Sequence, residues 1–205
     1  LVAALPAALQ NDPGLLYDRA QWRKNARGAS DPCILIEQID GNLVPAVARA
    51  RLWNDLRRCA SDDLKSGNYL QAYNILSRHG LSNGSDFADA EFLSGFIALR
   101  KLHDPEKADA HFAKLESGVR TPVSKSRAAY WRAVAAQERK DAAAANAFFG
   151  LAAQYPTTFY GQLAAQKYAP GAPLTLPPQT APTDADKALF EARPLTKAIR
   201  ILAAL

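Results

Sequence analysis

The segment LHDPEKADAHFAKLE, residues 102–116, contains the pattern on which the fold prediction depends. Asp104 is followed by an alanine four positions later and by a phenylalanine eight positions later. Because four residues make about one helical turn, the alanine and the phenylalanine lie on the same face of a helix. Asp104 can accept a hydrogen bond from a free N–H group of the first turn, and Pro105 suits the first helical position. The segment therefore predicts a short amphipathic helix that begins at Asp104–Pro105.

The same pattern occurs twice more, in SGNYLQAYNILSRHG (66–80) and RKDAAAANAFFGLAA (139–153). The polar caps are separated by 36 and 37 residues, and so are the alanines and the large apolar residues that follow them. The matching positions are Asn68, Asp104 and Asp141, then Ala72, Ala108 and Ala145, then Leu76, Phe112 and Phe149. A nearly constant period indicates an array of similar structural units.

A second amphipathic stretch precedes each cap, at 48–65, 89–102 and 126–140. Apolar or small residues recur there at the three- and four-residue intervals of a buried helical face. The residues expected to be buried are Leu52, Leu56, Cys59 and Ala60, then Phe92, Phe96 and Leu99, then Ala129, Ala133 and Ala136. Each unit is therefore predicted to be a helical hairpin with an apolar face that it cannot bury alone.

Stacking of neighbouring hairpins buries these faces. We therefore expect an all-α fold, an α-superhelix (solenoid) of hairpins with a period of about 36–37 residues. This period is slightly longer than the about 34 residues of tetratricopeptide repeats, so the units are described as tetratricopeptide-like.

The stretch after the third hairpin predicts one more helix. Pro156 ends the preceding helix, because a proline disfavours helical backbone at the residue before it. Thr157 or Thr158 then caps a new helix within PTTFYGQLAA (156–165). Gly161 is unfavourable in a helix by propensity, so we expect it to allow a close backbone approach to the preceding hairpin.

Four regions are expected along the chain: an N-terminal segment at 1–14, the solenoid at 15–169, a proline-rich and mostly extended connector at 170–184, and the start of a further helical layer at 185–205. The opening LVAALPAALQ is too short to span a bilayer and lacks the basic region of an intact signal peptide. The sequence lacks methionine and stops inside a helical pattern, so we expect a piece of a longer protein.

The net charge of +5 arises mainly in residues 121–205, which carry 10 basic and 5 acidic groups. A basic surface favours nucleic acid, anionic lipid or an anionic polymer such as cell-wall glycan, although so small an excess also fits an ordinary solvated surface. The two cysteines, Cys33 and Cys59, lack metal-ligand spacing. They form one disulfide in an oxidising compartment or are small core residues in a reducing one, and the sequence leaves both open.

No catalytic or cofactor-binding motif is visible. The 11 glycines form no phosphate-binding cluster, and no serine lies in a nucleophile elbow. We therefore predict no catalytic residue, cofactor or metal in this chain. Structural roles are expected for the remaining candidates: surface or cap positions for His79, His103 and His111; core positions for Trp22, Trp53 and Trp131; helix starts for Asp62, Asp63, Asp184 and Asp186; and a helix end for Glu116.

Two groups of basic residues can form a positive stripe. No aromatic residues alternate with them in the manner of a single-strand binder, so no nucleic-acid partner is expected. The groups are Arg19, Arg23, Lys24 and Arg27, and Arg49, Arg51, Arg57 and Arg58.

From about residue 15 onward the chain resembles the helical region of soluble lytic transglycosylases, periplasmic enzymes that cleave peptidoglycan glycan strands, and most of all their alphaproteobacterial versions. The resemblance rests on LYDRAQWRKNARG (16–28), SGNYLQAYNILSRHGL (66–81), residues 89–133, and YPTTFYGQLAAQ (155–166) with the connector and PLTKAIRILAAL (194–205). In that family the catalytic glutamate lies in an E-S motif of a separate lysozyme-like domain, followed by G-L-M-Q. Glu116-Ser117 lies inside the repeats and the chain has no methionine, so no catalytic role is transferred.

The resemblance implies a non-catalytic scaffold, located in the periplasm, that positions glycan strands or its own downstream catalytic domain. Its expected partners are peptidoglycan and that domain, without a membrane span. Possible glycan or partner contacts are Trp131, Arg132, Tyr155 and Tyr160. The alternative is a tetratricopeptide-like adaptor that binds a protein partner and has no enzymatic parent.

Overall fold

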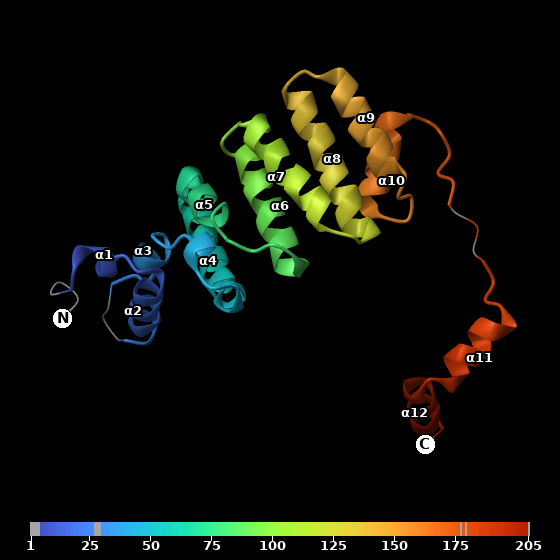
Figure 1. Cartoon of the computed structure of the whole chain (residues 1–205). Coiled ribbons are helices and arrows are strands. Elements are labelled where there is room, and N and C mark those ends of the chain that lie inside the picture. Colours follow the sequence, from blue (N-terminus) through green and yellow to red (C-terminus); the bar gives the residue numbers. More distant parts are fainter. Residues whose placement is uncertain (1–4, 27–29, 177, 179, 205) are drawn as a thin grey trace. The chain divides into compact units, whose positions relative to one another are not determined.

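The computed structural model describes residues 5–26, 30–176, 178 and 180–204, and all regular secondary structure in this part of the chain is helical. The all-α prediction is therefore confirmed (Figure 1). The elements in chain order are α1 (Ala7–Gln10), α2 (Pro13–Asn25), α3 (Cys33–Ile36), the 3-10 turn η2 (Gly41–Leu43), α4 (Ala46–Ser66), α5 (Tyr69–Leu76), α6 (Gly84–Arg100), α7 (Pro105–Gly118), α8 (Pro122–Glu138), α9 (Ala142–Ala153), α10 (Phe159–Tyr168), α11 (Asp184–Ala192) and α12 (Pro194–Ala203).

The chain divides into two compact units, Leu1–Leu174 and Thr175–Leu205. In the first unit the helices pack mainly on their neighbours in the chain, α4 on α5, α6 on α7, and α8 on α9. Successive pairs also touch, because α5 contacts α6, α7 contacts α8, and α10 packs on both α8 and α9 (Figure 1). Local packing of this kind joins each pair of helices to the next along the chain.

Polar caps fix several of the helix starts. Asp104 accepts from the N–H of Lys107 and Asp141 from that of Ala144, as the sequence predicts. Thr121 caps α8 in the same way and accepts from the N–H of Ser124. Thr158 caps α10 by accepting from the N–H of Gly161. Asn68 is different: it occupies the cap position of α5, but its side chain makes no cap hydrogen bond and donates to Asp63 instead.

Small residues allow the helices of the first unit to approach closely. The alanines expected on α8 are buried, and so are the four residues expected on α4. Leu99 of α6 is buried as well, whereas Phe92 and Phe96 are only partly buried.

Trp53 is fully buried, but Trp22 is 68% exposed, so the core position predicted for Trp22 is wrong. An amphipathic surface helix presents one face to water, and Trp22 lies on that face of α2.

Gly161 confirms the expected close approach. A Cβ atom at this position would lie 2.0 Å from the carbonyl oxygen of Tyr155, at the end of the preceding hairpin. A second close approach joins η2 to the loop after α5, where the N–H of Gly41 donates to the carbonyl of Arg78 at 2.8 Å. A Cβ at Gly80 would lie 2.2 Å from the carbonyl oxygen of Gly41. Only glycine fits at these contacts.

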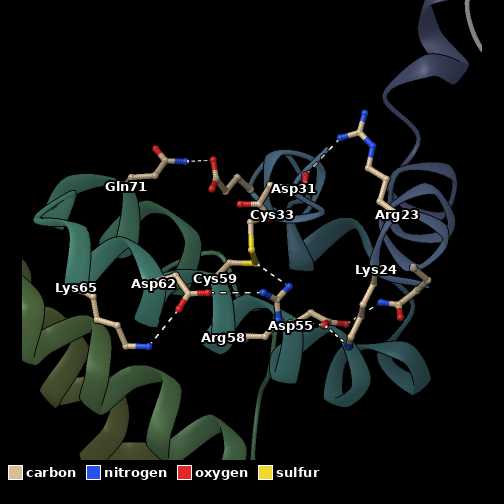
Figure 2. Close-up of a disulfide and its surroundings, with 12 residues drawn as sticks. Arg23, Lys24, Asp31, Cys33, Asp55, Arg58, Cys59, Asp62, Lys65 and Gln71 are labelled. Atoms are coloured by element: carbon tan, nitrogen blue, oxygen red, sulfur yellow. Dashed lines mark hydrogen bonds and ion pairs between the residues drawn. A yellow bond between two sulfur atoms is a disulfide. The ribbon is translucent and has the colours of Figure 1, made fainter. Parts of the chain in front are cut away.

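Cys33 and Cys59 form a disulfide, which decides between the two alternatives left open by the sequence. Their Cα atoms are 5.5 Å apart, and the bond joins α3 to the middle of α4 (Figure 2). Both side chains are buried. The disulfide therefore attaches the N-terminal helices covalently to the first long helix of the unit.

In the second unit, α11 and α12 pack on each other, and the described residues before them have no regular secondary structure. Thr183 and Asp186 form a capping box at the start of α11, so Asp184 and Asp186 lie at a helix start as predicted. The large apolar side chains of both helices are exposed: Leu189, Phe190, Leu195, Ile199, Ile201 and Leu202. None of the helices in the described part of the chain combines the length and apolar character that a bilayer span requires.

Candidate functional site

The first candidate site is a row of aromatic rings that crosses α6, α8 and α10. We call it the aromatic row and define it as Phe96, Trp131, Tyr130, Tyr160 and Phe159. Successive ring centroids in this order are 5.3, 5.9, 5.3 and 5.2 Å apart. Phe159 is 69% exposed, and the other four rings are partly buried. Five rings from three helices are therefore in consecutive contact, and Phe159 at one end of the row is exposed.

Two of the four contact residues predicted from the sequence belong to this row. Trp131 and Tyr160 have ring centroids 6.5 Å apart. Trp131 also packs against Phe112 of the core, and this contact restricts the movement of its ring. Aromatic side chains held rigidly at a surface lose little conformational entropy on binding, so they are favoured at contact sites.

The other two predicted residues have local structural partners. Arg132 donates to Asp109 at 2.8 Å and to Glu116 at 2.7 Å, and its guanidinium carbon lies 4.1 Å from the ring centroid of Phe148. Burial alone would lower the pKa of Arg132, but the hydrogen bonds to the two carboxylates raise it. The carbonyl of Tyr155 accepts from the N–H and the hydroxyl of Thr158. Arg132 thus ties α8 to α7, and Tyr155 shapes the start of α10.

The second candidate site is a buried carboxylate held between two imidazoles, which sequence analysis missed. Glu91 of α6 is only 4% exposed. Its Oε1 accepts from Nε2 of His79 at 3.2 Å, and its Oε2 accepts from Nδ1 of His111 at 2.6 Å. Nε2 of His111 in turn lies 3.1 Å from the hydroxyl of Tyr73 on α5. We call Tyr73, His79, Glu91 and His111 the Glu91 cluster.

The surface or cap positions predicted for His79 and His111 are therefore wrong, because both imidazoles are buried. His103 is exposed, as expected, in the turn before α7. A buried charge is tolerated where hydrogen bonds replace its hydration, and the two imidazoles do this for Glu91. The one signal in the sequence was a glutamate on a face of small residues, since Ala88, Gly95 and Ala98 lie three, four and seven positions away.

The cluster changes the acidity of its carboxyl group. Burial alone would raise the pKa of Glu91, but hydrogen bonds and positive charge from His111 and His79 outweigh it and lower the pKa to about 2. Both carboxylate oxygens have partners. Glu91 is therefore an ionised structural acceptor at neutral pH and has no proton to give as a general acid.

A polar cavity of about 390 Å³ lies beside the Glu91 cluster. His79 and Glu91 form part of its wall, and residues of the loop between α5 and α6 line one side. The remaining lining residues are Asn42, Ser77, Gly80, Leu81, Ser82, Phe87, Lys114, Ser117 and Gly118. No group of three or more histidine, cysteine or carboxylate side chains in the described residues is arranged to hold a metal ion.

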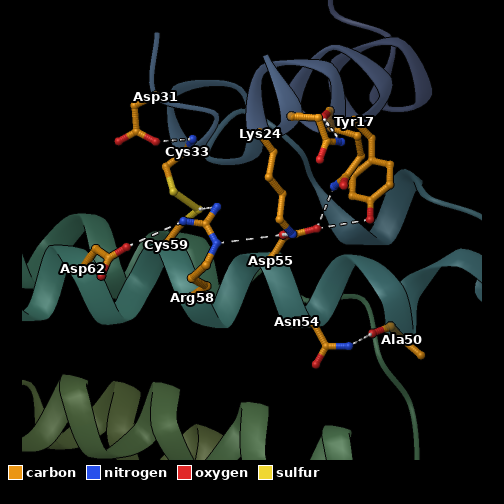
Figure 3. A network of polar contacts seen from close by, with 12 residues as sticks. Tyr17, Lys24, Asp31, Cys33, Ala50, Asn54, Asp55, Arg58, Cys59 and Asp62 are labelled. Carbon is orange, nitrogen blue, oxygen red and sulfur yellow. Dashed lines mark hydrogen bonds and ion pairs between the residues drawn. A yellow bond between two sulfur atoms is a disulfide. The ribbon is translucent and has the colours of Figure 1, made fainter. Parts of the chain in front are cut away.

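A third polar group surrounds Asp55 of α4 and connects α2 to α4 (Figure 3). Asp55 accepts from Tyr17 at 3.1 Å, from Gln21 at 2.8 Å and from Lys24 at 3.1 Å. Burial, followed by the charge of Asp55, raises the pKa of Tyr17. Lys24 and Arg58 both pair with this carboxylate. The two basic groups seen in the sequence are thus partly neutralised, and Arg27 lies outside the described residues.

The ion pairs of α4 extend from Asp55 toward the disulfide. Arg58 pairs with Asp62 at 3.7 Å and donates to the sulfur of Cys59 (Figure 2). Asp62 and Asp63 lie in the last turns of α4, so their predicted position at a helix start is wrong. Glu116, by contrast, lies near the end of α7, as expected, and its carboxylate is occupied by Arg132.

No protein-family model, no curated protein and no solved structure matches this chain.

Proposed function

We propose that this chain is the non-catalytic helical scaffold of a periplasmic lytic transglycosylase, and that it positions peptidoglycan glycan strands for a downstream catalytic domain. In this proposal the hairpins α4–α5, α6–α7 and α8–α9 are tetratricopeptide-like units of a superhelix. The sequential packing of the pairs and their period of 36 and 37 residues support that arrangement. The family resemblance of the sequence supplies the substrate class.

The aromatic row carries the proposal. It offers five rings across three helices, with centroids between 5.2 and 5.9 Å apart along the row. Aromatic surfaces bind ligands that have both apolar and polar groups, because the ring faces bury the apolar part while the hydroxyl of tyrosine can form hydrogen bonds. A sugar ring, with C–H groups on its faces and hydroxyls at its edge, matches such a surface.

The disulfide supports the proposed compartment. Disulfides form and persist in oxidising environments such as the bacterial periplasm and are rare in the cytosol. Cys33 and Cys59 are both buried, which is typical of a structural bond. The occupied carboxylates of Glu91 and Glu116 favour a scaffold over an enzyme, since each already has hydrogen-bonding partners.

Sedimentation with purified peptidoglycan tests the proposal. We expect Phe159→Ala and Tyr160→Ala to weaken the retention of the chain, together by about tenfold if the two rings behave as binding hot spots. Trp22→Ala is the matched control, because Trp22 is as exposed as Phe159 but lies on α2. Circular dichroism confirms that each variant keeps its helices.

Three outcomes contradict the proposal. Equal retention of all three variants excludes the aromatic row as the binding surface. Muralytic activity of the chain in a zymogram excludes a non-catalytic role. Stable capture of a protein partner that Phe159→Ala abolishes, without any binding to peptidoglycan, favours the adaptor alternative instead.

A further inference from the structure

A cavity of about 390 Å³, separate from the one beside the Glu91 cluster, is lined by the end of α8, by α9 and by the end of α10. Phe149 and Ala145, both buried, form an apolar part of its wall together with Ala142. The side-chain amides of Gln137 and Asn146 lie on the same wall. A partly apolar cavity on which a few polar groups converge is typical of sites that bind small organic ligands. We call it the Lys140 cavity, after one of the two lysines that complete it.

These two lysines give the cavity a positive charge. Lys140 lies in the turn between α8 and α9, and Lys167 lies in the last turn of α10. Within the part of the chain that the structure describes, no acidic residue lines this cavity and neither lysine forms an ion pair. The acidic residues next to Lys140 in sequence have other partners, because Glu138 pairs with an arginine of α6 and Asp141 caps α9. Both ammonium groups can therefore bind a negatively charged ligand.

The backbone at Lys140 is an independent observation. Its φ is 61°, in the left-handed region where glycine is favoured and a side chain costs conformational energy. The equivalent position of the first hairpin is Gly67, with a φ of 82°. In both turns the N–H of the next residue donates to the carbonyl five positions earlier, at 2.8 and 2.9 Å. The second hairpin has His103 there, and histidine is one of the side chains that tolerate this conformation.

A lysine is thus unfavourable for a turn that glycine forms without strain. Strained backbone of this kind occurs preferentially at ligand sites, where the side chain has a role that offsets the cost. The Lys140 side chain lines the cavity. The strain and the positive charge of the cavity therefore point to the same residue.

We propose that the Lys140 cavity binds the carboxylate of an N-acylated amino acid with a small side chain. Lys140 and Lys167 bind the carboxylate through charge-assisted hydrogen bonds. Gln137 and Asn146 each offer an amide that can both donate to and accept from the amide of the ligand. The small side chain packs on Phe149.

The composition of the wall selects this ligand class. Inorganic phosphate would use the two ammonium groups but neither the amides nor the apolar wall. The volume of about 390 Å³ lies at the lower end of the range for ligand cavities, which favours a small ligand. The Lys140 cavity shares no residue with the aromatic row, so this binding does not depend on the proposed function.

Titration with N-acetylalanine, followed by nitrogen-15 NMR of the unaltered chain, tests the site. We expect saturable shifts of the backbone amides of Lys140, Asn146 and Lys167. N-acetylalaninamide differs only in that a neutral amide replaces the carboxylate, and it should bind about tenfold more weakly, because the charge-assisted hydrogen bonds are lost. Absence of the shifts with N-acetylalanine, or equal binding of both compounds, would overturn the proposal.

Inorganic phosphate is the third probe. It should bind more weakly than N-acetylalanine, because it makes no contact with the amides or with the apolar wall. Equal or tighter binding of phosphate would mean that the cavity attracts any anion, which contradicts the assigned ligand class.

Two variants each remove one ammonium group. We expect Lys167→Ala and Lys140→Gly to weaken the binding of N-acetylalanine about tenfold each, whereas Lys65→Ala should bind like the unaltered chain. Lys65→Ala is the matched control because it removes an exposed lysine of α4, outside the cavity. Unchanged binding in Lys167→Ala and Lys140→Gly would exclude the two lysines as the carboxylate site.

Lys140→Gly also separates binding from folding. Because glycine suits the left-handed backbone of this turn, the melting temperature of the variant should equal or exceed that of the unaltered chain while its binding falls. A lower melting temperature together with weaker binding would mean that Lys140 supports the fold, and it would overturn the assigned role in binding.

Discussion

The carbonyl oxygen of Tyr155 occupies the space next to Gly161 in which any other residue would place its side chain: a Cβ there would lie 2.0 Å from the oxygen. The same carbonyl accepts two hydrogen bonds from Thr158, which caps α10 through the N–H of Gly161. The residue that follows α9, the cap residue Thr158 and the first turn of α10 therefore all meet at the carbonyl group of Tyr155.

Gly161→Ala is expected to destabilise the chain by about 3 kcal/mol, the upper end of the cost of overpacking, because the nearest group, the carbonyl of Tyr155, is backbone and cannot turn aside. Urea denaturation followed by circular dichroism measures the loss. Gln166→Ala, at an exposed position of the same helix, should change the stability by less than about 0.5 kcal/mol. A Gly161→Ala chain as stable as the unaltered one would show that Tyr155 and α10 can move apart without loss of folding free energy.

Loss of the disulfide should weaken the attachment of the N-terminal helices. The bond closes a loop between residues 26 positions apart, for which chain-entropy arguments give about 3 to 4 kcal/mol. We expect the double variant Cys33→Ser, Cys59→Ser to lose stability of this size. Dithiothreitol should lower the stability of the unaltered chain by a similar amount and have no effect on the double variant. An effect of the reductant on both chains would point to a cause other than this bond.

The Glu91 cluster predicts an acid transition. The pKa of Glu91 falls from 4.5 to about 2 in the folded chain, because hydrogen bonds from the two histidines outweigh the effect of burial. Since the folded-state pKa is the lower one, ionised Glu91 stabilises the fold above about pH 4.5, and this contribution is lost as the pH falls toward about 2. The melting temperature should therefore decrease across this window.

Glu91→Gln does not titrate and should show a smaller decrease across the same pH range, although it starts from a lower melting temperature because a buried partner is lost. Glu106→Gln is the control, since Glu106 is exposed in the first turn of α7. Parallel pH profiles of Glu91→Gln and the unaltered chain would contradict the assigned role of this carboxylate.

The helix caps allow a matched comparison. Asp141→Ala should cost about 1 kcal/mol, because the side chain accepts from the free N–H of Ala144. Asn68→Ala, at the corresponding position of α5, should cost less, because Asn68 makes no cap hydrogen bond. The measurement is the free energy of unfolding in urea. Equal losses would mean that the cap position matters more than the hydrogen bond.

The polar caps at Asp104 and Asp141 and the alanine spacing of the hairpins were predictable from the sequence, because both depend on residues within one or two helical turns. The same reasoning failed for Trp22 and for His111. An amphipathic pattern shows that a helix has a buried face, but a single large residue near its edge is assigned to that face only when the packing partner is known.

The sequence by itself therefore determined that the chain is helical, where α5, α7, α9 and α10 begin, and that the pattern recurs with a nearly constant period, since these properties arise from local backbone and side-chain interactions. Only the tertiary structure decided that Cys33 pairs with Cys59, that five rings form the aromatic row, and that Glu91 meets two histidines 12 and 20 positions away. These contacts depend on which helix faces meet in space, and a repeat period does not specify that.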